Sequence, residues 1–172
     1  MLDVLKTRRS IRKYQDKPIE QEKLNTILKA ALTSPSSKGK RPWELIVVED
    51  KETLLELSHC RGGSSKLIAG SAVSIVVVAD KELTDVWIED ASILGTIIQL
   101  TAHSLTLGSC WVQIRERMTT EDKTAEAYVK EVLGIPLQYG VECVIALGYP
   151  AEEKEPYSEE KLPLDKIHSE KF

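Results

Sequence analysis

The sequence predicts one layered domain of the α/β or α+β class, in which helices pack on a small sheet. Four short runs rich in apolar and β-branched residues alternate with segments of helical periodicity. A long apolar segment, residues 85–107, suits the centre of such a domain. A chain of 172 residues can build one hydrophobic core, or a subunit whose core a partner completes.

The first half of the chain predicts two helices, a loop and a strand. Residues 20–33, EQEKLNTILKAALT, carry apolar side chains on one face at helical spacing, and Pro18 suits the helix entry. Residues 34–42, SPSSKGKRP, predict a loop because Pro, Gly and three serines do not continue a helix. Residues 43–49 predict a strand, and residues 51–58 predict a second helix.

The second half alternates strands with longer helices. Residues 73–79, VSIVVVA, favour a strand buried on both faces. Residues 85–107 predict a helix that is either central or shared with another subunit, and Gly108 stands where a C-terminal cap belongs. The remaining elements are a strand at 109–114, a surface helix at 119–133 that ends near Gly134, and a strand at 141–148.

The last segment, residues 149–172, is polar, contains prolines and has no core periodicity of its own. A tail of this kind either frays or lies across another subunit. The chain shows no internal repeat and no low-complexity linker, so we treat residues 1–172 as a single domain.

Composition and charge exclude several classes of protein. No apolar run approaches the ~20 residues that span a bilayer, and the first nine residues lack the pattern of a secretory signal, so we expect no membrane partner. The three cysteines lack a CxxC spacing, which disfavours a disulfide framework or zinc site and favours a reducing, cytoplasmic setting. A formal net charge of −4 disfavours a dedicated nucleic-acid surface.

Two basic segments carry hydroxyl groups. Residues 6–14, KTRRSIRKY, hold five cations, and Arg8, Arg9 and Ser10 offer guanidinium forks and a hydroxyl that match one phosphate. The loop SPSSKGKRPW offers serines together with lysines and an arginine. Each segment alone also fits a solvated surface turn. Their pairing on either side of one helix favours a binding function.

A third segment, residues 108–117, GSCWVQIRER, places a cysteine, a tryptophan and a glutamine at a helix-to-strand turn. Gln113 could hydrogen-bond a heterocycle, whereas Cys110 and Trp111 also fit plain core packing. The chain has no GxGxxG, GxxxxGK[ST] or GxSxG motif and no cluster with metal-ligand spacing. An enzyme of this composition would therefore use an organic cofactor.

The order of these segments resembles the FMN-dependent nitroreductase family. The resemblance rests on RRSIRKY, SPSSKGKRPWELIVVED, TLGSCWVQ and VIALGYP, and it covers nearly the whole chain. The short length is similar to the compact branch of the family. The resemblance implies an α+β fold of three layers, α/β/α, around a mostly antiparallel sheet. It also implies an intertwined homodimer with FMN at the subunit interface and the tail 149–172 packed on the partner.

The resemblance also implies site residues, with the chemistry carried by FMN and no catalytic side chain or metal. Arg8, Arg9 and Ser10 would hold the phosphate and ribityl region, with Arg12 beside them. The Pro35–Ser37 loop would reach the partner's flavin. The remaining expected cofactor contacts are Lys66, Cys110, Trp111, Val112, Gln113 and Lys161. The loop departs from the family pattern at Lys38-Gly39-Lys40-Arg41, so Lys40 and Arg41 are expected to bind substrate.

The function expected from this resemblance is an oxidoreductase of the ping-pong type. NAD(P)H would deliver hydride to the flavin and leave, and a small electron-poor acceptor such as a nitroaromatic or a quinone would then be reduced in the same pocket. An alternative is a protein that stores or senses FMN without turnover. A nucleic-acid-binding domain built on the basic N-terminus is a third reading, which the acidic body opposes.

Overall fold

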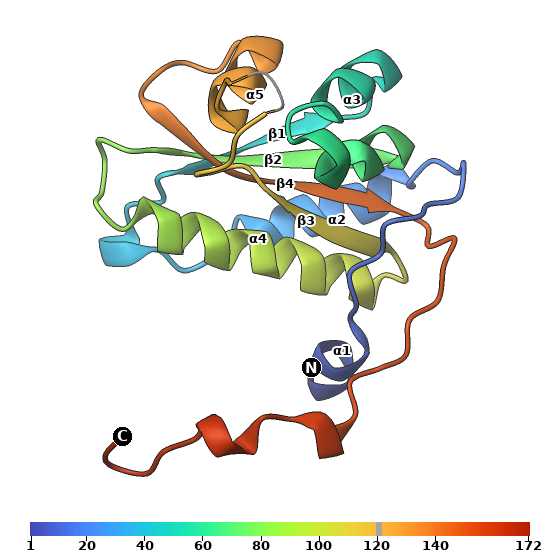
Figure 1. Cartoon of the computed structure of the whole chain (residues 1–172), viewed down its shortest axis with the longest axis vertical. Helices are drawn as coiled ribbons and strands as arrows, with labels where there is room; N and C mark the ends of the chain where they lie inside the picture. Colours follow the sequence, from blue (N-terminus) through green and yellow to red (C-terminus); the bar gives the residue numbers. More distant parts are fainter. Residues whose placement is uncertain (120–121) are drawn as a thin grey trace.

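The computed structural model describes residues 1–119 and 122–172, and it contains an antiparallel sheet (Figure 1). In the described residues the sheet has four strands in the order β1-β2-β4-β3, and each neighbouring pair is antiparallel. The strands are β1 (Trp43–Val48), β2 (Val73–Asp80), β3 (Gly108–Gln113) and β4 (Tyr139–Gly148). The sheet confirms the expected α+β class.

Helices cover both faces of this sheet and complete three layers (Figure 1). On one face lie α2 (Gln21–Ala31) and α4 (Trp87–Ser104). On the other lie α3 (Lys51–Leu57), the 3-10 segment η2 (Gly62–Gly70) and α5 (Ala125–Leu133). Along β2, Ile75 and Val77 pack toward α2 and α4, while Val76 and Val78 pack toward the opposite layer. The continuous apolar run therefore predicted correctly a strand buried on both faces.

The end of α4 differs from the prediction. The helix stops at Ser104, and Thr106 takes the left-handed conformation with φ of 66°, so that the chain turns and buries Leu107. The sequence predicted Gly108 as a helix cap, but Gly108 is the first residue of β3. A glycine is needed there for another reason, which is the close approach of Ile11.

Two elements were not expected from the sequence. The helix α1 (Leu2–Thr7) buries none of its residues, so its sequence has no amphipathic pattern to detect. The segment η2 contains three glycines and two serines, which mark a loop in sequence. The helix predicted at 119–133 begins at Ala125, with the Thr124 hydroxyl accepting from the Ala127 N–H; residues 120 and 121 lie outside the described part.

The C-terminal tail leaves the body of the molecule next to α1 (Figure 1). Residues 153–172 are exposed, and their short 3-10 turns, Glu159–Lys161 and Leu164–Lys166, bury no side chain. The tail contacts α1 through the Tyr157 N–H, which donates to the Lys6 carbonyl at 3.0 Å. Within the described residues, no helix is long and apolar enough to cross a membrane.

Candidate cofactor-binding site

The basic N-terminal segment lies along β3, which brings two of the sequence motifs together. Ser10 forms a parallel bridge with Ser109, and the Ile11 N–H donates to the Ser109 carbonyl at 2.9 Å. The segment that holds Arg8, Arg9 and Ser10 therefore borders the strand that holds Cys110 and its neighbours. The sequence predicted both motifs as cofactor-binding, and the fold makes them adjacent.

A pair of glycines allows this approach. Gly108 and Gly148 lie directly opposite each other in the β3–β4 register. A Cβ atom added at Gly108 would lie 2.8 Å from the Ile11 Cβ, and one at Gly148 would lie 2.8 Å from Cδ1 of Tyr14. Neither distance is compatible with ordinary packing, so residues 10–14 rest directly on the strand backbones. Sequence reasoning missed this pair, although both glycines stand inside motifs that it singled out.

Tyr14 fixes the far end of the same segment. Its hydroxyl lies 2.7 Å from the Ile11 carbonyl and 3.2 Å from the Ala146 carbonyl. Burial raises the pKa of Tyr14 well above its ordinary value, so this phenol stays protonated as a donor. The Glu152 carboxylate accepts from the Arg12 N–H at 2.6 Å and holds the middle of the segment.

The guanidinium groups of Arg8 and Arg12 are available for an anion. Arg8 is half-buried, and neither side chain makes a hydrogen bond or ion pair to any residue that the structure describes. Burial raises the pKa of the Cys110 thiol, and the positive charges of Arg12 and Arg8 oppose that rise, which places both cations near this cysteine. A half-buried cation without a counter-ion is costly, so this corner of the fold is suited to a phosphate group.

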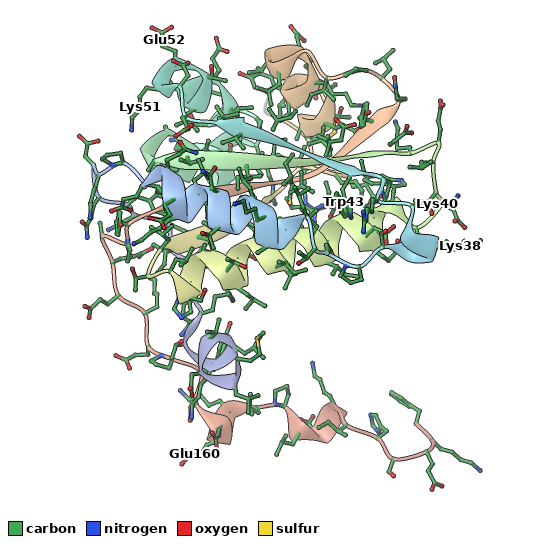
Figure 2. The ribbon with its side chains drawn as sticks, turned by 180° about the vertical axis from the view of Figure 1, so that it is seen from behind. Lys38, Lys40, Trp43, Lys51, Glu52 and Glu160 are labelled. Carbon is green, nitrogen blue, oxygen red and sulfur yellow. The ribbon has the colours of Figure 1, made fainter. Side chains whose placement is uncertain are left out.

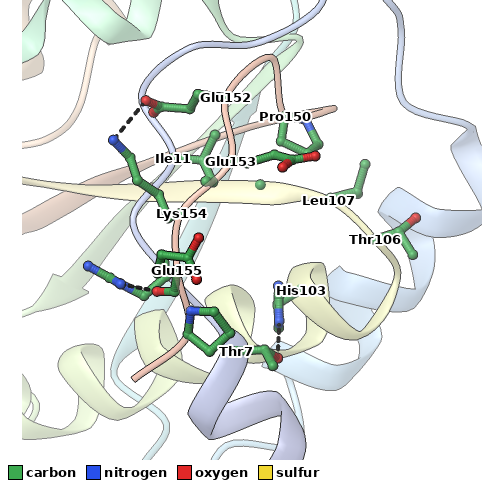
Figure 3. A pocket seen from close by; sticks show the side chains of 13 residues that line it. Thr7, Ile11, His103, Thr106, Leu107, Pro150, Glu152, Glu153, Lys154 and Glu155 are labelled. Carbon is green, nitrogen blue, oxygen red and sulfur yellow. Dashed lines mark hydrogen bonds and ion pairs between the residues drawn. The ribbon is translucent and has the colours of Figure 1, made fainter. Parts of the chain in front are cut away.

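Arg9 behaves differently from its two neighbours. Its Nη1 donates to the Glu155 carbonyl, and its guanidinium lies 4.7 Å from the ring centre of Tyr157. Arg9 therefore ties the tail to the N-terminal segment. It also lines a hollow of about 480 Å³ between α1, the end of α4 and residues 150–156 (Figure 3).

His103 stands on the wall of this hollow (Figure 3). Its Nε2 lies 2.7 Å from the Thr7 hydroxyl, which itself donates to the Asp3 carbonyl at 2.6 Å. Because a hydroxyl has one proton to give, Nε2 of His103 must donate to Thr7. Burial lowers the pKa of His103, and the positive charge of Arg8 lowers it further.

Successive side chains of β3 point to opposite faces of the sheet, and a hydrogen-bond network links those on one face. Indole Nε1 of Trp111 donates to Oε1 of Gln113 at 2.8 Å, and Nε2 of Gln113 donates to Oε1 of Glu142 at 3.2 Å. Glu142 is buried and pairs with Arg115, with 3.3 Å between Nε and Oε2. Gln113 also donates to the Arg115 carbonyl, so both of its amide protons are committed.

The alternation separates the four predicted contacts on this strand. Val112 packs into the layer of α3 and α5, whereas Trp111 packs toward α4, where the ring covers Gly95. Cys110 and Gln113 occupy the neighbouring positions on those two faces. The side chains of all four residues cannot meet one face of a ligand.

The Pro35–Ser37 loop lies at the opposite end of α4. The Ser37 N–H donates to Oδ1 of the buried Asp90 at 2.9 Å. His103, near Arg8, is thirteen residues further along the helix, a rise of roughly 20 Å at 1.5 Å per residue. Within one chain, the loop and the phosphate-binding segment are therefore too far apart to contact the same part of a ligand.

The other predicted residues lie apart from Arg8. Lys66 is exposed on η2, in the layer opposite α4, and Lys161 is exposed in the tail. Lys40 donates to the Leu83 carbonyl at 2.6 Å, and Arg41 is exposed. Sequence reasoning missed Asp90 and Glu142. Glu142 is a single acid within an apolar strand, whereas Asp90 stands next to the exposed Glu89 in the first turn of α4 and gives no separate signal.

Comparisons with known proteins identify the family of this chain. The model of the nitroreductase family matches residues 5–61 and 56–149. A relative from Archaeoglobus fulgidus, whose name joins NADH dehydrogenase and NAD(P)H nitroreductase, is 37% identical over 99% of this chain and 98% of its own length. The structure of an FMN-dependent nitroreductase from Clostridium difficile R20291 is 53% identical, with a TM-score of 0.98 over 100% of both chains.

A more distant structure shares the fold. The NADPH:FMN oxidoreductase from Vibrio harveyi, complexed with NAD+, has a TM-score of 0.83 at 24% identity. The match covers 99% of this chain and 74% of that protein. The names of the relatives identify the chain as an NAD(P)H-dependent oxidoreductase. The chain belongs to the nitroreductase family, as the sequence motifs predicted.

Proposed function

We propose that this chain is an FMN-dependent oxidoreductase that takes hydride from NADH or NADPH and passes it to a small electron-poor acceptor, such as a nitroaromatic or a quinone. The names of the relatives support this proposal. The Clostridium difficile protein, 53% identical over its whole length, is described as FMN-dependent. A Methanothermobacter thermautotrophicus relative, 36% identical, carries the same joint name as the Archaeoglobus protein.

The observation that carries the proposal is the phosphate-binding corner. Arg8 and Arg12, whose side chains have no partner among the described residues, flank Ser10, and Ser10 is bridged to β3. An FMN phosphate of charge about −2 would satisfy both cations and the hydroxyl at once. The basic segment at the start of an acidic protein then has a compact role, which requires no nucleic acid.

A homodimer completes the proposed site. The Pro35–Ser37 loop and Arg8 lie at opposite ends of α4, so one flavin can meet both only if the loop comes from a second copy of the chain. Exposed apolar side chains along the tail and on α4 suit such an interface: Leu162, Leu164, Ile167, Phe172 and Ile93 are 47, 64, 74, 107 and 42% exposed. We propose that the tail packs on the partner.

The chain's own groups bind and orient rather than react. Bound FMN supplies the two hydride transfers. Arg8, Ser10 and Arg12 hold its phosphate, and the Trp111–Gln113–Glu142 network gives β3 a rigid wall. Burial raises the pKa values of Cys60, Cys110 and Cys143, so these thiols stay protonated and do not act as nucleophiles. Lys66 and Lys161 remain candidates for further flavin contacts.

Steady-state turnover tests this proposal. With FMN added, the protein should oxidise NADH or NADPH only slowly in the absence of an acceptor other than oxygen, and faster when a nitroaromatic or a quinone is present. Parallel initial-rate lines at varied acceptor concentrations would identify the ping-pong order. FMN binding with no acceptor-dependent oxidation of either nucleotide would contradict the proposed enzyme and favour storage or sensing.

A further inference from the structure

The loop between α2 and β1, residues 34–42, has a strained backbone. Lys38 and Arg41 adopt φ values of 52° and 49°, and Gly39 adopts 66°. Left-handed conformations are uncommon for residues with a side chain, and they persist only where the surrounding structure holds them. Two such residues in one short loop show that its shape is enforced from outside.

Hydrogen bonds from three directions enforce it. The Ser37 N–H donates to Oδ1 of Asp90 at 2.9 Å, and the Arg41 N–H donates to the Ser36 hydroxyl oxygen at 2.9 Å. The carbonyl of Pro42 accepts from the Asp80 N–H at 2.8 Å, which fixes the entry to β1. Among these three hydrogen bonds, the one to the Asp90 side chain anchors the centre of the loop to another element, α4.

Three polar side chains of the loop are left free by this arrangement, whereas Ser36 and Lys40 are hydrogen-bonded. The Ser37 hydroxyl and the charged groups of Lys38 and Arg41 make no hydrogen bond or ion pair with residues 1–119 or 122–172. Lys38 stands on the outer side of the loop (Figure 2). A backbone held in a strained shape, with unbonded polar groups on it, is the form of a preorganised binding surface.

The burial of Asp90 has a cost for the fold. The residue is 4% exposed, and its Oδ2 has no hydrogen-bond partner among the described residues. A buried carboxylate with an unbonded oxygen bears a desolvation cost that one hydrogen bond does not offset. This cost is a reason to look for the role of Asp90 in what it does to the loop.

We propose that Asp90 is a positioning residue, which holds Ser37 in the orientation that meets the flavin of the partner subunit. This inference rests on the proposed function, because the proposed dimer is what brings the loop to a flavin. Asp90 touches neither cofactor nor substrate and acts through the Ser37 backbone. The flavin affinity and the KM for the reduced nicotinamide should therefore depend on Asp90 more than the stability of the fold does.

The test compares Asp90→Leu with Glu89→Gln in the full chain, because leucine has a similar shape to aspartate but no atom that accepts from the Ser37 N–H. Glu89 is the exposed neighbour on α4, so its replacement removes the same charge without touching the loop. For Asp90→Leu we expect the Kd for FMN to rise at least about fivefold, the KM for NAD(P)H to rise with it, and the melting temperature to stay equal or increase. Glu89→Gln should leave all three unchanged. A lower melting temperature with unchanged Kd and KM would overturn the proposal.

Two further results distinguish a failure of the proposed function from a failure of the role of Asp90. A wild-type protein that takes up no FMN would overturn the proposed function and the role of Asp90 with it, whereas wild-type uptake with an equal Kd for Asp90→Leu would overturn the role of Asp90 alone. Should Asp90→Leu not fold, hydrogen exchange of the wild-type Ser37 amide decides. Exchange at least about tenfold slower than in an unstructured chain is expected, and exchange at the unprotected rate contradicts the proposal.

Discussion

At the scale of single residues, the charge on Arg8 links the proposed phosphate site to its surroundings. Its guanidinium has no counter-ion among the described residues, and its field reaches both His103 and Cys110. The sequence indicated Arg8 and Ser10 because arginine and hydroxyl side chains suit a phosphate. It could not show that Arg9 turns to the tail, since that depends on contacts with Glu155 and Tyr157 far along the chain.

Replacing Arg8 with alanine should weaken FMN binding. Removing one charge-assisted phosphate contact costs roughly 1.5–3 kcal/mol, which corresponds to a Kd increase of roughly 10- to 150-fold. Fluorescence titration of FMN with the variant measures this change. Lys13→Ala is the control, because Lys13 is an exposed cation of the same basic segment. Wild-type affinity in Arg8→Ala, or an equal loss in Lys13→Ala, would show that Arg8 does not hold the phosphate.

His103 should make the flavin-free protein less stable in mild acid. Its pKa in the fold is lowered by burial and then by Arg8, whereas in the unfolded chain it is about 6.5. The unfolded chain therefore takes up the proton first, and stability falls as the pH drops from about 6.5 toward the folded pKa. Above pH 6.5 the contribution is constant.

Urea unfolding at about pH 7.5 and pH 5.5 measures this effect in wild type and His103→Gln. The loss of unfolding free energy between these two pH values should be smaller in the variant. An identical loss in both proteins would contradict a lowered pKa for His103.

At the scale of elements, the segment 10–14, which lies over β3 and β4, positions the proposed site. Short apolar runs predicted the strands well because β2 and β4 are buried on both faces and contain little else. The helix α1 has no buried face, and so nothing in its sequence indicated it. Contacts between distant elements, such as Gly108 with Ile11, leave no periodicity in either sequence and require the fold to be seen.

Gly108→Ala should displace this segment. The added Cβ would lie 2.8 Å from the Ile11 Cβ, so the backbone of residues 10–12 has to move away from β3. Overpacking of this kind costs about 1–3 kcal/mol of unfolding free energy, and the displaced Ser10 and Arg8 should also lose FMN affinity.

Gly70→Ala provides the matched control for this substitution. No atom lies within 4 Å of the position that a Cβ would take at Gly70. Chemical denaturation and FMN titration of both variants measure the two effects. Full stability and affinity in Gly108→Ala would contradict the close packing of residues 10–12 on the strand.

At the scale of the whole molecule, the two groups of predicted flavin contacts are separated by the length of α4. The sequence alone could not show this separation, because residues 8–10 and 35–37 are close along the chain and flank a single helix. The fold turns that proximity into opposite ends of the domain. A flavin shared between two chains reconciles the two groups, and it also gives the exposed tail a surface to cover.

Sedimentation velocity of the purified protein, recorded in both the protein and the flavin absorption bands, tests this account most directly. We expect a single species with the mass of two chains that carries flavin absorbance, with one FMN released for each chain on denaturation. A monomer that carries the flavin would contradict the shared site. A colourless protein that also fails to take up added FMN would contradict the proposed cofactor and the phosphate-binding role of Arg8 and Ser10.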